Sequence, residues 1–236
     1  MAVSYRALSL LLAYPSDQLQ ASAPEILAAL AEEGLLSPPL LRALAKLTEE
    51  LARDDLYALQ ERYTDLFDRT RSLSLNLYEH VHGESRDRGE AMVALLELYR
   101  SHGLDLAASE LPDFLPVFLE FLSTLPEDEA ASLLGEAGHV LEAMAERLKS
   151  RRSPYRAVFG ALAHLASGQA DPAALAALLN EPDPDPDDLE ALDKAWAETA
   201  VTFGPGEDGC PKAEALVRAM GAETKAPARR GAGASA

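Results

Sequence analysis

Apolar residues recur along most of this 236-residue chain at intervals of three and four positions, with polar residues between them. That spacing places apolar side chains on one face of a helix and predicts an all-α protein. We expect a single bundle of roughly ten helices, because a chain of this length can bury one large core. The predicted helices cover residues 5–12, 17–30, 39–51, 54–67, 84–102, 114–122, 133–148, 154–162, 172–179 and 189–196.

Residues that favour helix ends separate several of these segments. Ser16 and Asp17 can cap the second helix, and Gly34 follows its last apolar position. Pro39 suits the first turn of the third helix. Pro24 falls inside the second helix, but the apolar pattern continues past it, so we predict an uninterrupted helix there.

Residues 72–80, SLSLNLYEH, depart from the helical spacing because leucine alternates with polar residues. Such alternation alone indicates a half-buried strand. No other stretch of the sequence offers a partner strand, and a lone strand cannot satisfy its backbone hydrogen-bonding groups. We therefore predict an irregular or helical connector.

The stretch NEPDPDPDDLE, residues 180–190, alternates proline and aspartate. Proline lacks an N–H group and disfavours a helical residue before it, so this stretch predicts an extended linker. We predict a helical domain over residues 1–179 and the linker over 180–188. The same domain is then expected to continue as a closing helix and loop over 189–221, followed by a disordered tail over 222–236.

Charge narrows the choice of partner. The chain has 39 acidic and 21 basic residues, which gives a net charge of −18. Residues 221–236 have a net charge of +2, so the remaining residues, the body of the protein, have a net charge of −20. Nucleic-acid binding depends on neutralising phosphates, so DNA and RNA are excluded as expected partners. An acidic body attracts basic peptides and speeds their encounter, although its acidity could also serve solubility alone.

The sequence also bears on compartment and membrane. Cys210 is the single cysteine, so no disulfide can form within the chain, and a reducing compartment fits. No segment approaches the roughly 20 apolar residues that cross a bilayer, and the N-terminus lacks a secretory cleavage pattern. We expect a cytoplasmic protein that is not inserted in a membrane.

Candidate chemistry is concentrated in YEHVHGESRDRGEAM, residues 78–92. His80 and His82, with the neighbouring glutamates, raise the possibility of a metal site. Residues two apart point roughly 200° away from each other on a helix, so the two imidazoles cannot share a metal in that conformation. The HExxH pattern of helical zinc hydrolases is also absent. We expect no metal, but a metal-binding helical enzyme remains the alternative hypothesis.

Signatures of other enzymes are absent as well. The chain contains no GxSxG elbow, no phosphate-binding GxxxxGK[ST] loop and no GxGxxG dinucleotide turn. Cys210 lies in a Gly- and Pro-rich stretch with no base near it in sequence, which argues against a nucleophile. With 39 acidic residues, carboxylate pairs arise by chance. We expect no catalytic residues and no bound cofactor.

The same motif also predicts a rigid corner between two helices. Asp87 and Glu90 have the spacing of a capping box at a helix start. Gly83 permits a sharp turn into that start. Arg86 and Arg88 can bind nearby carboxylates such as those of Glu79 and Glu84.

The motif and three other stretches carry a resemblance. NLYEHVHGESRDRGEAMVALLELYRSHGLDL with LPDFLPVFLEFLSTLP, YRALSLLLAYPSDQL and DKAWAETAVTFGPGEDGCP are similar to the nitrate reductase molybdenum cofactor assembly chaperones. These are the delta-subunit or NarJ type, within the TorD-like helical chaperones of redox enzymes. The resemblance covers about residues 3–212, and the PDPDPDD stretch is the part about which it says least.

The resemblance implies a cytoplasmic, all-helical, non-catalytic protein that takes part in nitrate assimilation. Such chaperones bind the N-terminal segment of the respiratory nitrate reductase catalytic subunit. They keep it competent for molybdenum cofactor insertion and prevent early membrane docking. Proteins that deliver the molybdenum cofactor are a second class of partner to consider. A scaffold that stays in the finished membrane complex is a further alternative.

A client segment could bind as an amphipathic helix in a groove between helices. The expected partner-binding residues are Tyr63, Phe67, Glu79, His80, His82, Glu84, Arg86 and Arg88, with Gly83, Asp87 and Glu90 shaping the corner. The Phe114–Phe121 face is another candidate lining. Aromatic residues at helical spacing are more often core than groove, so a core position for each of them stays the alternative.

Overall fold

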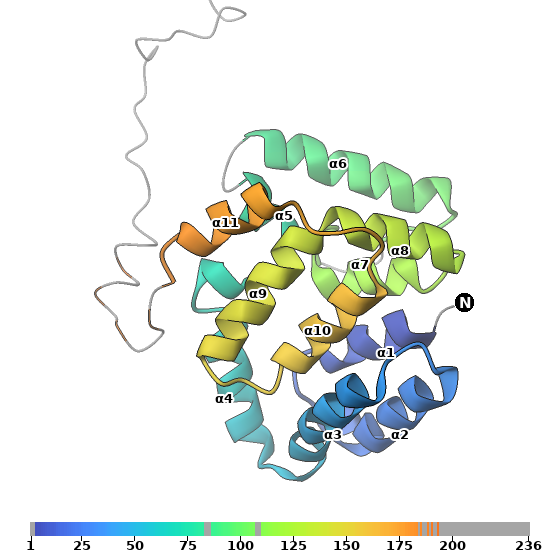
Figure 1. Cartoon of the computed structure of the whole chain (residues 1–236), viewed down its shortest axis with the longest axis vertical. Helices are drawn as coiled ribbons and strands as arrows, with labels where there is room; N and C mark the ends of the chain where they lie inside the picture. The colour runs from blue at the N-terminus through green and yellow to red at the C-terminus, as the bar shows by residue number, and fades with distance from the viewer. Residues whose placement is uncertain are drawn as a thin grey trace, which may run out of the picture. The chain divides into compact units, whose positions relative to one another are not determined.

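The computed structural model describes residues 3–82, 86–106 and 110–183, together with Asp185, Asp188, Glu190 and Asp193. All of them belong to one unit, residues 1–195. The described residues contain the following helices (Figure 1): α1 Val3–Leu11, α2 Asp17–Glu33, α3 Pro38–Arg53, α4 Leu56–Phe67, η1 Arg71–Leu73 (a 3-10 helix), α5 Leu77–His82, α6 Arg86–Ser101, α7 Leu115–Leu122, α8 Glu127–Glu136, α9 Gly138–Ser150, α10 Arg156–Leu165 and α11 Pro172–Asn180. The predicted all-α class is confirmed.

Helix ends follow the capping residues closely. The Ser16 side chain accepts a hydrogen bond from the Leu19 N–H at 3.2 Å and so caps α2. Gly34 ends α2 with a φ of 76°, a left-handed conformation that favours glycine. Asp55 caps α4 by accepting from the Ala58 N–H at 3.1 Å. Pro24 lies inside α2 without interrupting it, as predicted.

A single apolar core runs through the unit. Helix α1 packs between α2 and α7, while α10 packs against α9, α3 and α1. Leu8, Leu44 and Phe159 are fully buried where these helices meet. In Figure 1, α1, α2 and α3 lie at one end of the unit and α6 lies at the other, above α7 and α8. None of the described helices has both the length and the apolar character needed to span a membrane.

The connector between α4 and α6 has the irregular structure predicted for it. Its alternating leucines, Leu73, Leu75 and Leu77, are all buried, but the segment forms η1, a single bridge and α5 rather than a strand. The Leu77 N–H donates to the Asp113 carbonyl at 3.0 Å, and the Leu115 N–H donates to the Leu75 carbonyl at 2.8 Å. These two hydrogen bonds join the chain just before α5 to the chain just before α7.

The predicted single helix over residues 133–148 is wrong. The chain breaks at Ala137 (φ −88°, ψ 3°) into α8 and α9. The Ser167 N–H donates to the Ala131 carbonyl at 2.9 Å, and a Cβ at Gly135 would collide with the Ser167 carbonyl oxygen. The segment at Ser167 therefore lies so close to the end of α8 that position 135 requires glycine. Leu134 and Leu141 are two helical turns apart, so the apolar stripe continues across the break and hides it.

The buried guanidinium of Arg147 attaches the end of α11. It donates to the Ser72 carbonyl at 2.8 Å and to the Leu178 carbonyl at 2.5 Å. Beyond α11, Asp183 accepts from Ser72 Oγ at 2.6 Å and pairs with Arg151. This is the described start of the predicted linker. Of the predicted closing helix only Glu190 and Asp193 are described, and both are helical. Apart from Asp185, Asp188, Glu190 and Asp193, residues 184–236 and the boundaries proposed there lie outside the described residues.

Candidate functional site

A buried polar corner joins α5, α6 and the chain before α7. The Asp113 side chain is fully buried, and its Oδ2 accepts from the Tyr78 N–H at 3.1 Å. Arg88 lies 3.7 Å from the same oxygen through Nη2, and its Nη1 donates to Glu79 Oε1 at 3.1 Å. The predicted pairing of Arg88 with Glu79 is thus present. One guanidinium, from the first turns of α6, binds carboxylates on two other segments.

The corner holds charge that is expensive to bury alone. Burial raises the pKa of the Asp113 carboxyl above its ordinary value, while the Tyr78 N–H and Arg88 act in the opposite direction. Asp113 Oδ1 and Arg88 Nε are buried without a hydrogen-bond partner in the described part of the chain. Because a buried charge needs a counter-charge, Arg88 and Asp113 depend on each other.

His80 and His82 lie in different surroundings. His80 is buried, and its Nε2 lies 2.8 Å from the Ser74 carbonyl oxygen. A carbonyl only accepts, so His80 carries its proton on Nε2. Burial lowers the pKa of His80, which favours the neutral form. His82 is half-buried and contacts the Tyr78 ring edge-on at 5.6 Å between centroids. The described residues contain no group of three or more potential metal ligands.

The predicted helix cap is displaced. Helix α6 already begins at Arg86, so Asp87 lies in its first turn instead of before it. Asp87 and Glu90 are exposed, and from there the Asp87 carboxylate still complements the positive end of the helix dipole. Gly83, Glu84 and the side chain of Arg86 lie outside the described residues.

Beside the corner is a hollow of about 350 Å³ that opens to the surface. We call it the apolar hollow. Its wall combines α5, α6, α7, α8 and α9, and it is mainly aliphatic and aromatic, with Glu136 and His139 as its charged or titratable exceptions. The lining residues are Leu77, Tyr78, Val81, Ala94, Leu95, Leu98, Phe118, Leu133, Glu136, Ala137, His139 and Val140.

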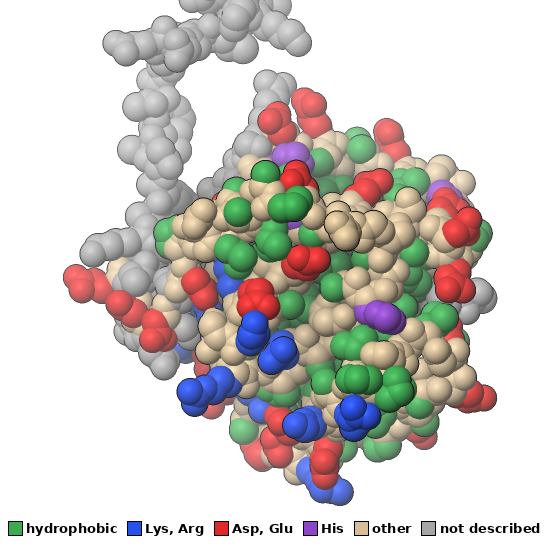
Figure 2. Space-filling model, viewed as in Figure 1, with side chains coloured by type: hydrophobic (Ala, Val, Ile, Leu, Met, Phe, Trp, Pro, Cys, Tyr) green, Lys and Arg blue, Asp and Glu red, His purple; other side chains and the backbone are tan. Residues whose placement is uncertain are grey.

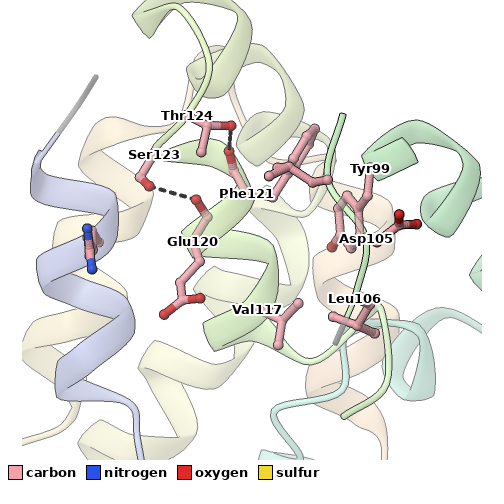
Figure 3. A pocket seen from close by; sticks show the side chains of 10 residues that line it. Tyr99, Asp105, Leu106, Val117, Glu120, Phe121, Ser123 and Thr124 are labelled. Carbon is pink, nitrogen blue, oxygen red and sulfur yellow. Dashed lines mark hydrogen bonds between the residues drawn. The ribbon is translucent and has the colours of Figure 1, made fainter. Parts of the chain in front are cut away.

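A second hollow of about 270 Å³ lies on the other side of the α6–α7 contact. Figure 3 shows it, with Val117 on α7 beside Leu106 on the segment after α6, and with the Glu120 side chain extending from α7 away from that segment. Arg6 from α1 completes the wall. The second hollow therefore combines apolar surface with the carboxylates of Asp105 and Glu120 and the guanidinium of Arg6. Asp105 is exposed and lies 3.4 Å from Arg100.

Helix α6 contributes lining residues to both hollows and is held by few buried groups. Among its described side chains only Leu95 and Tyr99 are buried. The Tyr99 hydroxyl donates to the Pro112 carbonyl at 2.7 Å, and its ring contacts Phe121 at 4.6 Å between centroids. An apolar hollow and a carboxylate-edged hollow on either side of one helix suit an amphipathic segment that carries basic residues.

Tyr63 and Phe67 lie elsewhere, in the core. Each is 4% exposed, and their rings lie 4.9 Å apart in a cluster with Tyr14 and Tyr155. The Tyr63 hydroxyl donates to the Leu12 carbonyl at 2.8 Å. These two residues therefore line neither hollow, and a docking role for them would require the core to open. The Phe114–Phe121 face does contribute, since Phe118 and Phe121 line one hollow each.

Sequence reasoning missed Asp113 and the inner face of α6. A signal for α6 was present, because Met92, Val93, Leu95, Leu96 and Leu98 cover more of the helix than one narrow stripe needs. For Asp113 the signal was a lone acidic residue within the apolar run LPDFLP.

Comparison with known proteins shows which family the chain belongs to. Residues 33–161, more than half of the sequence, match the model of the nitrate reductase delta subunit family. The chain belongs to that family. The matched range contains the polar corner and every residue of the apolar hollow, and of the second hollow only Arg6 lies outside it.

Relatives within the delta subunit family are assembly chaperones by name. The nitrate reductase molybdenum cofactor assembly chaperone NarJ of Escherichia coli K12 is 41% identical over 202 residues, which cover 86% of this chain and 85% of NarJ. NarW of the same strain, named a probable chaperone of the same kind, is 38% identical over 198 residues. The alignment covers 84% of this chain and 82% of NarW.

A solved structure agrees on the fold. A redox enzyme maturation protein of Archaeoglobus fulgidus superimposes with a TM-score of 0.51 and 25% identity. The superposition covers 69% of this chain and 92% of that protein. The TorD-like helical fold expected from the resemblance is confirmed.

Proposed function

We propose that this chain is an assembly chaperone for respiratory nitrate reductase. In this proposal it binds the N-terminal segment of the catalytic subunit in the cytoplasm and keeps that subunit competent for molybdenum cofactor insertion before membrane docking. It acts by binding and transforms no substrate. Its membership of a family whose relatives are named as molybdenum cofactor assembly chaperones carries the proposal.

The two hollows beside α6 supply a physical basis for peptide binding. An amphipathic helix can place its apolar side chains in the apolar hollow, where leucine, valine and phenylalanine side chains line the wall. Basic residues of the same segment would meet Glu120 and Asp105 at the second hollow and Glu136 at the first. A chain of net charge −18 favours the approach of such a segment.

Two valines of similar exposure allow a matched test. Val81 lines the apolar hollow and is 52% exposed, whereas Val93 lies on α6 outside both hollows and is 57% exposed. Val81→Arg places a cation where an apolar client face is expected. We expect it to weaken binding of a synthetic peptide with the reductase N-terminal sequence at least about tenfold, or about 1.4 kcal/mol.

Isothermal titration calorimetry measures this effect, and Val93→Arg is expected to bind the peptide like the parent chain. A deletion strain complemented with each variant should then mature nitrate reductase normally with Val93→Arg and poorly with Val81→Arg. The same affinity in both variants would remove the apolar hollow from the proposal. Failure of the unaltered chain to bind the peptide would reject client binding itself.

A further inference from the structure

A groove of opposite character lies between α3 and α10, and it shares no lining residue with the hollows beside α6. Its volume is about 610 Å³. Lys46 stands on α3, Lys149 at the end of α9, Arg152 in the turn that follows, and Arg156 at the start of α10. Figure 2 shows Lys and Arg side chains gathered over this part of the unit. We call it the basic groove.

Three of these cations are available to a ligand. Within the described ranges, no acidic side chain forms an ion pair with Lys46, Arg152 or Arg156, and all three are exposed. Lys149 pairs with Glu146 at 2.8 Å. Among the described residues, Glu50 is the one carboxylate that lines the groove, and it pairs with Arg62 at 2.8 Å. On a chain of net charge −18, such a concentration of unpaired positive charge is unusual.

Arg152 occupies a backbone position that favours glycine. Its φ is 54°, and the other described residues with positive φ are Gly34, Gly103 and Gly168. The Ser153 N–H donates to the Leu148 carbonyl at 2.9 Å and the Arg152 N–H to the Lys149 carbonyl at 3.0 Å, which is the geometry of a helix end usually completed by glycine. Non-glycine residues in the left-handed conformation recur at functional positions. Here the residue in that conformation is Arg152, whose side chain lies at the rim of the basic groove.

Small residues make up most of the apolar floor of the groove, with Leu40 beside them. Ala43 on α3 faces Ala157 and Gly160 on α10. A Cβ at Gly160 would lie 3.6 Å from Leu40 Cδ2, which is an ordinary contact, so packing between the helices does not require glycine. Glycine inside a helix is unfavourable, and its use here leaves room for the close approach of another chain.

We propose that the basic groove binds an acidic amphipathic helix of a partner protein. The small apolar floor receives the apolar face of that helix, and Lys46, Arg152 and Arg156 bind its carboxylates from the two rims. A small phosphate ligand fits less well, because the cations stand apart on exposed rims above an apolar floor. A nucleic acid fits less well too, because an extended polyanion would meet the acidic remainder of the body.

The test uses the full chain and two synthetic helical peptides. Both have alanine and leucine on one face, and the other face carries glutamate in one peptide and lysine in the other. Fluorescence anisotropy is expected to show saturable binding of the glutamate peptide that weakens with salt. Lys46→Glu with Arg156→Glu should weaken it at least tenfold. The control, Arg42→Glu with Arg53→Glu, makes the same charge change on α3 outside the groove and should have little effect.

Two single variants separate side-chain recognition from folding. Arg152→Gly removes one cation and relieves the left-handed backbone, so peptide binding should weaken while the unfolding temperature stays the same or rises. Gly160→Leu fills the floor with every charge kept, and it should also weaken binding. Neither variant should change binding of the reductase N-terminal peptide at the other site.

Three outcomes would overturn the proposal. One is the absence of saturable binding of the glutamate peptide, and another is equal loss of binding in the groove variant and its control. The third is binding of inorganic pyrophosphate that displaces the peptide and depends on the same residues, which would assign the groove to a small anion.

Discussion

Helix α10 has ten residues and buries five of them, whereas α6 has sixteen and, among its described side chains, buries only Leu95 and Tyr99. The first packs against α3, α9 and α1, and the second is held by one tyrosine, one leucine and the polar corner at its start. Stability therefore depends mainly on the helices around α10, because stabilisation scales with apolar surface removed from water. The surroundings of α6 are left free to form hollows.

The largest expected effect is in the tightly packed region. Phe159 in α10 is fully buried, so Phe159→Ala removes a large ring and leaves a cavity. We expect a loss of about 3–5 kcal/mol in the free energy of unfolding, measured by denaturant titration. Val93→Ala on the exposed face of α6 should change it by less than about 0.5 kcal/mol. Similar losses from both would contradict the contrast between the two helices.

The next effect concerns the one strong attachment of α6. Arg88→Ala leaves the fully buried Asp113 carboxylate without its counter-charge, and we expect a loss of about 3 kcal/mol. Adding Asp113→Asn removes that charge while keeping an oxygen for the Tyr78 N–H. The double variant should therefore be more stable than Arg88→Ala alone. Additive losses would show that the two side chains are not coupled.

Replacing glycine by alanine should change the stability of the protein in opposite directions in the two regions. At Gly135 a methyl group collides with the Ser167 carbonyl, so Gly135→Ala should destabilise the protein by about 1–3 kcal/mol. At Gly89 in α6 nothing lies within 4 Å of the added methyl group. Gly89→Ala should therefore stabilise by about 0.5–1 kcal/mol through its helix preference. Thermal unfolding of both variants measures the difference, and a matching sign would contradict the packing described for α8.

The smallest effect is on the pH dependence of stability. Burial lowers the pKa of His80 in the folded protein, so the unfolded chain takes up a proton more readily. Stability should fall as pH drops below the unfolded value of about 6.5, by at most about 1.4 kcal/mol per pH unit. His80→Gln should remove this part of the slope, while His82→Gln, at a less buried position, should keep it. Denaturant titrations between about pH 5 and pH 7.5 compare them.

Much of the fold could be predicted because helices leave local signals. Apolar spacing predicted most helices, and the end residues Ser16 and Gly34 marked the start and the end of α2. The α8–α9 break escaped prediction because the apolar stripe continues across it, and the contact beside the break joins Gly135 to Ser167, more than thirty residues further along the sequence.

The site was harder to predict because it depends on pairings between distant segments. The motif over residues 78–92 predicted a corner with Arg88 near Glu79, and the Arg88–Glu79 hydrogen bond is present. Its second carboxylate, Asp113, is 25 residues away from Arg88, and no local pattern joins them. Periodicity placed Tyr63 and Phe67 on the apolar face of their helix but could not separate a groove lining, the role expected for them, from the core. Both lie in an aromatic cluster of the core.

The pair of backbone hydrogen bonds that joins residues 75–77 to residues 113–115 has a further consequence for motion. It closes the chain into a loop whose two ends meet, and α6 lies within that loop. A loop fastened at its base can open and reclose as a cooperative unit while the rest of the domain stays folded. Amide hydrogen exchange should then distinguish two groups of amides. Those along α6 should exchange fast, and the amides of Leu77 and Leu115, which donate the two hydrogen bonds at the base of the loop, should exchange slowly.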